Sequence, residues 1–172
     1  MDTRIILQTE RLRLRRFTTA DAPFIVTLLN SEGWLRYIGD RGVRTEDDAV
    51  RYLEAGPLSS YSARGFGLSL VETRAGTPVG MCGILVRDTL DHPDIGFAFL
   101  PEWSGLGYGY EIASATMHHA RGAWGLTTID AITLPGNALS IRLLERLGMQ
   151  RIGSTAPAGE ELYHYRSTVP NA

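Results

Sequence analysis

The sequence predicts a mixed α/β domain with the element order βααβββαβαββ. Short apolar or alternating runs of strand length are separated by segments with helical periodicity and helix-start signals. Glycine and proline stand at the boundaries between these runs, where the chain has to turn. At 172 residues the chain has the length of about one domain, and we expect that domain to span residues 7–170.

The first third of the chain is expected to form one strand and two helices. Residues 11–15 alternate strictly between arginine and leucine, which predicts a half-buried strand. Capping boxes that begin at Thr18 and Thr45 each predict a helix start. The second helix is expected to end at residues 56–57, where a glycine is followed by a proline.

The rest of the chain predicts six strands and two helices. One helix follows the glycine-rich segment near residue 109, with apolar residues at i, i+4, i+7 and i+11. The other begins at Asn137, a good N-cap residue, and ends at Gly148. The strands are expected at 66–72, 78–87, 95–100, 127–134, 149–153 and 161–168.

The segment 94–111 joins a strand to a helix through a glycine-rich turn. Pro101 ends the strand, because proline has no N–H for the sheet ladder. Gly105, Gly107 and Gly109 then allow a tight turn. A helix that starts in this way presents unpaired backbone N–H groups to an anion such as a phosphate. The turn lacks the lysine of a P-loop and the third glycine of a dinucleotide fingerprint.

The spacing of these glycines instead resembles the pyrophosphate-binding loop of the GNAT superfamily of acetyl-CoA-dependent N-acetyltransferases. Residues 101–111 are most similar to the Rim-type branch, which includes the ribosomal-protein N-terminal acetyltransferases. The chain departs from that branch at Gly109 and Ile112, where alanine is usual. Residues 137–149 resemble the next motif of the family, Asn-x-x-Ser-x-x-x-Leu-x-x-Leu-Gly-Phe. Two motifs in the correct order make the resemblance specific.

The resemblance extends over nearly the whole chain and implies the GNAT fold. In this fold a mixed, mostly antiparallel central sheet is splayed between its fourth and fifth strands, and helices flank it. Acetyl-CoA, the co-substrate, binds in the gap. Main-chain groups of the strand before the loop then pair with the pantetheine arm, and N–H groups of the loop hold the pyrophosphate. The cofactor-binding residues implied are Phe97, Ala98, Phe99, Leu100, Gly105, Leu106, Gly107, Tyr108, Gly109, Tyr110 and Asn137.

The resemblance also implies a reaction, the transfer of acetyl to a primary amine by direct attack in a ternary complex. Ser140 matches the motif serine and is expected to protonate the leaving thiolate; the alternative is that it only satisfies local backbone groups. A main-chain N–H near Leu100 is expected to be unpaired and to stabilise the oxyanion. Asp94 is a candidate general base. The alternative, for Asp94 and for every other candidate, is a solvated surface charge with no catalytic role. The other candidates are Glu32, Asp40, Glu160 and Glu161.

The acceptor amine is the least determined part of this interpretation. Trp34 and Tyr37 are expected to line the acceptor pocket, with core packing as the alternative. A protein N-terminal α-amine competes with a small-molecule amine such as a polyamine or an aminoglycoside. Because no strong base stands out, an amine of low pKa is favoured over lysine. A non-catalytic acyl-CoA-binding or regulatory module is the alternative from another class.

Composition excludes several other functions. The net charge of −2 argues against nucleic acid as a partner, and no apolar run approaches the ~18 residues of a membrane span. The N-terminus lacks the pattern of a signal peptide. The single cysteine, Cys82, is expected to be buried in a strand, and a cytoplasmic location is expected. The histidines lack metal-site spacing, so no metal is expected. Homodimers are common in this fold, but the sequence specifies no interface.

Overall fold

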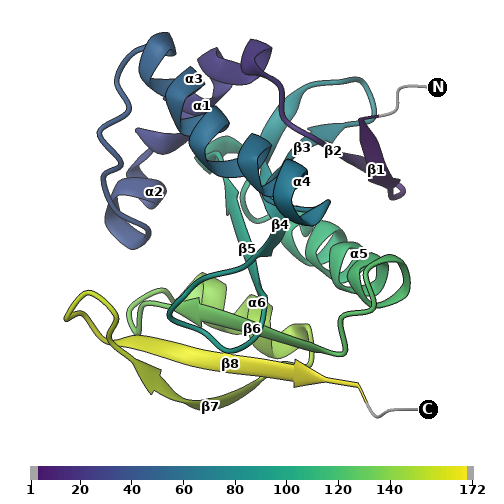
Figure 1. The fold of residues 1–172 in the computed structure, drawn as a ribbon, viewed down its shortest axis with the longest axis vertical. Helices are drawn as coiled ribbons and strands as arrows, with labels where there is room; N and C mark the ends of the chain where they lie inside the picture. Colours follow the sequence, from purple (N-terminus) through teal and green to yellow (C-terminus); the bar gives the residue numbers. More distant parts are fainter. Residues whose placement is uncertain (1–3, 170–172) are drawn as a thin grey trace.

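The computed structural model describes residues 4–169, and eight strands in these residues form a single sheet (Figure 1). Their order across the sheet is β1-β2-β3-β4-β5-β6-β8-β7. Every neighbouring pair is antiparallel except β5 and β6, which are parallel. The predicted fold class is therefore confirmed. The strands are β1 (Ile5–Gln8), β2 (Leu12–Arg15), β3 (Ser69–Thr73), β4 (Pro78–Leu85), β5 (Asp94–Phe99), β6 (Thr128–Thr133), β7 (Gln150–Thr155) and β8 (Leu162–Thr168).

The sheet is splayed between β5 and β6, as expected. These two strands are paired at one position only, Asp94 opposite Asp130. A backbone hydrogen bond of 2.8 Å from the N–H of Asp130 to the carbonyl of Pro93 closes the junction. Beyond it the strands diverge, so that β6, β7 and β8 form a separate lower layer in Figure 1. Beyond Asp94, one edge of β5 has no strand neighbour among the described residues.

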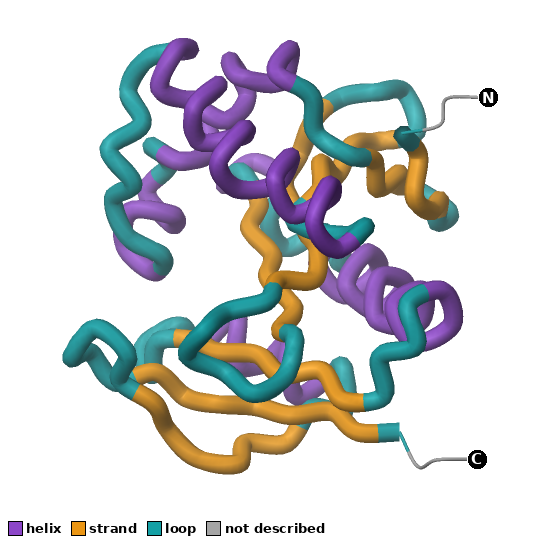
Figure 2. Tube along the Cα trace, viewed as in Figure 1, coloured by secondary structure: helices purple, strands orange, loops and turns teal. Residues whose placement is uncertain are grey.

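Helices cover both faces of the sheet (Figure 2). They are α1 (Ala22–Leu29), α2 (Glu32–Tyr37), α3 (Glu46–Leu53), α4 (Ser59–Arg64), α5 (Tyr108–Ala123) and α6 (Ala138–Arg146). Successive strand residues enter different cores: Leu70 and Met81 pack with α1 and α3, whereas Val71 and Cys82 pack with α5. Burial on both faces explains why β3 and β4 are continuous apolar runs in the sequence. Within residues 4–169, no helix is long and apolar enough to cross a membrane.

Three elements differ from the sequence prediction. Strand β1 and helix α2 were not predicted, because runs of four and six residues carry too little periodicity. The expected helix end at residues 56–57 is wrong. The chain continues through a π-helical turn, Glu54–Leu58, into α4, which ends at Gly65 with a φ of +81°. The buried Tyr61 holds this extension, because its hydroxyl accepts a hydrogen bond of 3.1 Å from the N–H of Phe17.

Candidate functional site

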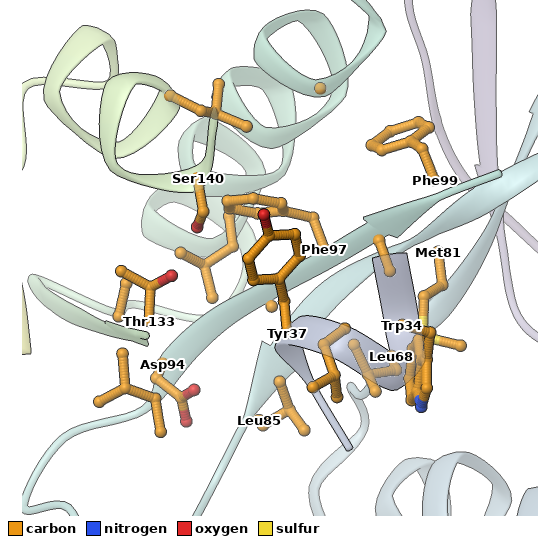
Figure 3. Close-up of a pocket in the computed structure, with 18 of the residues that line it drawn as sticks. Trp34, Tyr37, Leu68, Met81, Leu85, Asp94, Phe97, Phe99, Thr133 and Ser140 are labelled. Atoms are coloured by element: carbon orange, nitrogen blue, oxygen red, sulfur yellow. The ribbon is translucent and has the colours of Figure 1, made fainter. Parts of the chain in front are cut away.

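A cleft of about 1070 Å³ opens where β5 and β6 separate. It is lined by β4, β5 and the start of α5, by the end of β6 with α6, and by the segments from α2 to α4. Figure 3 shows residues of both halves around the same space, with Ser140 and Thr133 on one side and Trp34, Leu68 and Met81 on the other. The splay of the sheet thus creates the cavity that the fold was expected to provide.

The glycine-rich loop forms an anion-binding cradle at one end of the cleft. Gly105 and Gly107 have φ values of +76° and +80°, in the left-handed region that glycine adopts without strain. The backbone hydrogen bonds of α5 begin with the N–H of Glu111, which donates to the Gly107 carbonyl over 3.1 Å. Among the described residues, the N–H groups of residues 105–110 have no backbone acceptor. These free donors stand at the positive end of a 16-residue helix, an arrangement that suits a pyrophosphate.

Arg11, which precedes β2, contacts this loop and the first turns of α5 through its guanidinium group. Its Nη1 donates to the carbonyl of Leu106 over 2.9 Å, and its Nε donates to Glu111 over 2.7 Å. Its guanidinium also lies 4.7 Å from the ring centroid of Tyr108. Burial alone would raise the pKa of Glu111, but hydrogen bonds from Thr9 and Arg11 outweigh it and lower the pKa. Sequence reasoning missed Arg11, because its contact with Leu106 spans 95 positions and leaves no local signal.

The free edge of β5 corrects one predicted residue role. The N–H of Leu100 donates to the carbonyl of Val79 over 3.0 Å, so the unpaired N–H expected near Leu100 is not that of Leu100 itself. In an antiparallel ladder, opposed residues alternate between pairs that exchange hydrogen bonds and pairs that do not. The register of β4 and β5 therefore directs the main-chain groups of Ala98 to β4 and those of Phe97 and Phe99 away from it. Of the predicted cofactor-binding residues in this strand, Phe97 and Phe99 direct main-chain groups to the gap, whereas Leu100 is buried and does not line the cleft.

Ser140 and Asn137 lie at the start of α6, on the other side of the gap. The side-chain oxygen of Asn137 accepts a hydrogen bond of 3.2 Å from the N–H of Ser140, which confirms Asn137 as the N-cap. No hydrogen bond of the Ser140 hydroxyl is found among residues 4–169. Figure 3 shows this hydroxyl directed into the cleft, toward Phe97. Its geometry is that of a group available to a ligand.

Asp94 is the one carboxylate among the described residues that line the cleft. Its side chain is 1% exposed, and both of its oxygens accept hydrogen bonds from Nε of Arg87, at 3.0 and 3.1 Å. Burial raises the pKa of Asp94, and the Arg87 charge only partly offsets this rise. The other candidate bases of the sequence prediction lie outside the cleft lining: Glu32, Asp40, Glu160 and Glu161.

Trp34 and Tyr37, both from α2, line the cleft. Trp34 is 5% exposed and packs in the core beneath α1 and α3, and no partner is found for its indole N–H among the described residues. Tyr37 is half-buried, with the guanidinium of Arg36 at 5.0 Å from its ring centroid. The cleft lining also includes residues from distant segments, which sequence reasoning missed: Tyr52, Leu68, Met81 and Leu85.

Cys82 takes no part in the cleft. It is fully buried in β4, where burial raises the pKa of its thiol to about 12. A thiol with this pKa stays protonated and unreactive. The expectation of a buried, small hydrophobic residue is confirmed.

Comparison with known proteins identifies this architecture. Residues 11–150 match the family model of the acetyltransferase (GNAT) domain. The chain belongs to the GNAT acetyltransferase family. The curated relatives of this GNAT chain include the uncharacterized N-acetyltransferase YoaA of Bacillus subtilis, which is 26% identical over 149 residues. That alignment covers 86% of the chain and 84% of YoaA.

Solved structures share the fold at lower identity. A GNAT-family acetyltransferase from Bordetella pertussis superimposes with a TM-score of 0.80 and 23% identity, over 95% of this chain and 99% of that one. The acetyltransferase from Salmonella typhimurium that modifies the N-terminal serine of ribosomal protein L7/L12 has a TM-score of 0.82 at 13% identity, with 96% and 99% covered. GNAT enzymes transfer acetyl from acetyl-CoA to an amine, and this chain is an acetyl-CoA-dependent N-acetyltransferase.

Proposed function

We propose that the acceptor is the α-amine at the N-terminus of a protein or peptide, attacked directly in a ternary complex with acetyl-CoA. The observation that carries this proposal is the composition of the cleft: among the described residues its one carboxylate is Asp94, which is already paired with Arg87. A lysine amine has a pKa of about 10.4 and needs a strong base near neutral pH, whereas an α-amine has a pKa of about 7.7–8.0. An α-amine is already substantially neutral at about pH 7.5, and this matches the weak base that is present.

The chain holds the cofactor with main-chain groups. The free N–H groups of residues 105–110 bind the pyrophosphate, and main-chain groups of Phe97 and Phe99 pair with the pantetheine arm as a further strand would. Acetyl-CoA supplies the activated acetyl thioester when bound. Each charge-assisted hydrogen bond of the loop is worth roughly 1.5–3 kcal/mol. Because these donors belong to backbone already fixed by Arg11 and Glu111, little ordering is required on binding.

Two side chains move the protons. The hydroxyl of Ser140 donates its proton to the departing thiolate sulfur, whose pKa of about 8.5 makes this transfer useful near neutral pH. Asp94 accepts the proton of the amine through a water molecule. Its raised pKa makes its carboxylate a better base than an exposed aspartate. Trp34 and Tyr37 shape the wall that the acceptor meets.

The test is release of free CoA with a panel of amines, followed by mass spectrometry of the products. The panel contains peptides with a free N-terminus and an internal lysine, the same peptides with a blocked N-terminus, a polyamine and an aminoglycoside. We expect acetylation of the α-amine, with a kcat/KM that rises with pH and levels off near the pKa of the free acceptor. Preferential acetylation of the lysine would refute the α-amine assignment. Tight CoA binding without turnover on any amine would instead indicate a non-catalytic module.

A further inference from the structure

Arginine dominates the charged lining of the cleft. The described residues that line it include five arginines but only one acid, Asp94. Two of these arginines lie on α6, and the guanidinium of Arg146 stands 4.2 Å from the ring centroid of Tyr110 in the cofactor loop. Arg142 and Arg146 are therefore assigned to the end of the cleft where the cofactor loop lies. The remaining three come from other elements: Arg41, Arg64 and Arg87.

Arg87 lies at the end of the cleft that is remote from the cofactor loop. It binds Asp94, the first residue of β5, whereas the loop follows the last residue of that strand. At about 3.3 Å per residue, the two ends of this six-residue strand are roughly 16 Å apart. One arginine side chain does not span that separation. Arg87 is therefore placed to meet the acceptor and not the pyrophosphate.

Arg41, which lies between α2 and α3, lines the same cleft. Burial raises the pKa of the Tyr52 hydroxyl, and the positive charges of Arg41 and Arg87 partly offset this rise. Both guanidinium groups thus act on one phenol that itself lines the cleft. Tyr37, also in the lining, comes from the helix just before Arg41. The acceptor end of the cleft is therefore both aromatic and cationic.

The described residues neutralise these three cations only in part. Among residues 4–169, no hydrogen bond or ion pair of the Arg41 or Arg64 side chain is found. Arg87 contacts Asp94 through Nε, which leaves both of its Nη atoms without a hydrogen bond in the same set of residues. Asp94 offsets one charge, so the three arginines leave an excess of two positive charges. The Nη atoms of a guanidinium match the spacing of carboxylate oxygens.

We propose that the acceptor carries a carboxylate close to its reactive amine, and that Arg41 and the Nη atoms of Arg87 bind this group. The inference rests on the proposed transfer to an α-amine and narrows it to peptides with an acidic side chain just after the first residue. A polyamine or an aminoglycoside would meet like charge at this end of the cleft, which opposes its binding.

Three synthetic peptides test the proposal. They share the first residue and differ in the next three, which are acidic, the corresponding amides, or lysine. For the wild-type enzyme at low salt we expect kcat/KM for the acidic peptide to exceed that for the amide peptide about 10-fold, with the lysine peptide lowest. About 0.5 M salt should reduce this preference, because the site is open to solvent.

Variants assign the preference to Arg41. Arg41→Gln should lower the ratio of acidic to amide kcat/KM to about 2–3. Arg51→Gln is the matched control: it removes the same charge from α3, beside Tyr52, but its side chain is 70% exposed, is paired with Asp48 and does not line the cleft. This control should keep the wild-type ratio.

Several results would overturn the inference. It fails if the amide peptide is acetylated as fast as the acidic peptide, or if Arg41→Gln and Arg51→Gln change the ratio alike; transfer to α-amines would survive both results. If no peptide reacts but free glutamate is acetylated faster than glutamine, the carboxylate subsite is supported and the peptide assignment fails. If spermidine reacts faster than every peptide and amino acid, both proposals fail.

Discussion

Replacing Arg11 with methionine tests whether the cofactor loop is held in its binding conformation before the cofactor arrives. Methionine keeps most of the aliphatic length of arginine but removes the guanidinium. The variant loses the ion pair with Glu111, the hydrogen bond to the Leu106 carbonyl and the contact with the Tyr108 ring. None of these groups belongs to the proposed acceptor site, so the effect should be confined to the cofactor.

The free energy lost in this variant can be estimated from how exposed Arg11 and its contact partners are. The Arg11 side chain is 45% exposed and that of Glu111 is 18% exposed, so the ion pair is worth about 0.5–1 kcal/mol. The hydrogen bond to the carbonyl adds about 1 kcal/mol, and the cation–π contact adds about 0.5–1 kcal/mol. The backbone N–H of Arg11 and the hydroxyl of Thr9 still bind Glu111, so the anchor is weakened and not abolished.

We therefore expect the dissociation constant of CoA to rise about 10-fold, which corresponds to about 1.4 kcal/mol. The melting temperature should fall by about 3–6 °C. Calorimetric titration with CoA and thermal unfolding measure the two quantities. Arg13→Met is the matched control: Arg13 lies on β2 and pairs with the buried Glu72, so stability should fall while CoA affinity stays unchanged.

An unchanged CoA affinity of the Arg11→Met variant would refute the view that Arg11 positions the loop. So would an equal loss of affinity in Arg13→Met, because general destabilisation would then account for both. Arg11→Lys gives a further check. A single ammonium group does not reproduce the two separate contacts to Glu111 and Leu106, so only partial recovery is expected.

Four further variants have expected results. Ser140→Ala should lower kcat by up to ~10²-fold with little change in CoA affinity, because the proton is donated only in the transition state; a kcat within about twofold of wild type would assign Ser140 a structural role. The pKa of Glu111 is lowered on folding, so its stabilisation is complete above its ordinary value of 4.5 and is lost as pH falls through the lowered value. Glu111→Gln should therefore flatten the acid limb of a stability-against-pH curve measured with urea, and an unaltered limb would contradict this. Gly83→Ala should destabilise the fold by roughly 3 kcal/mol, because its Cβ would lie 2.3 Å from the carbonyl oxygen of Gly67. Gly122→Ala in α5, where nothing lies within 4 Å, should instead stabilise it by about 0.5–1 kcal/mol, and chemical denaturation of both variants separates the two outcomes.

The fold class and the family follow from the amino-acid sequence alone, and so does the proposed cofactor end of the site. These features depend on interactions close along the chain. The alternating glycines and Pro101 fix the backbone of the loop locally, and Asn137 caps its helix through a residue three positions away. Local signals also placed Cys82 in a buried strand.

The proposed acceptor end and the pairing of individual main-chain groups could be found only from the three-dimensional structure. The register between β4 and β5 is set by side chains on two faces of a sheet, and it determines that Phe99, not Leu100, has a free N–H. The contacts of Arg11 with the loop join segments about 100 residues apart. Arg41 and Arg87 line one cleft because α2, α3 and β4 pack around it, and the spacing of residues along the sequence does not reveal this packing.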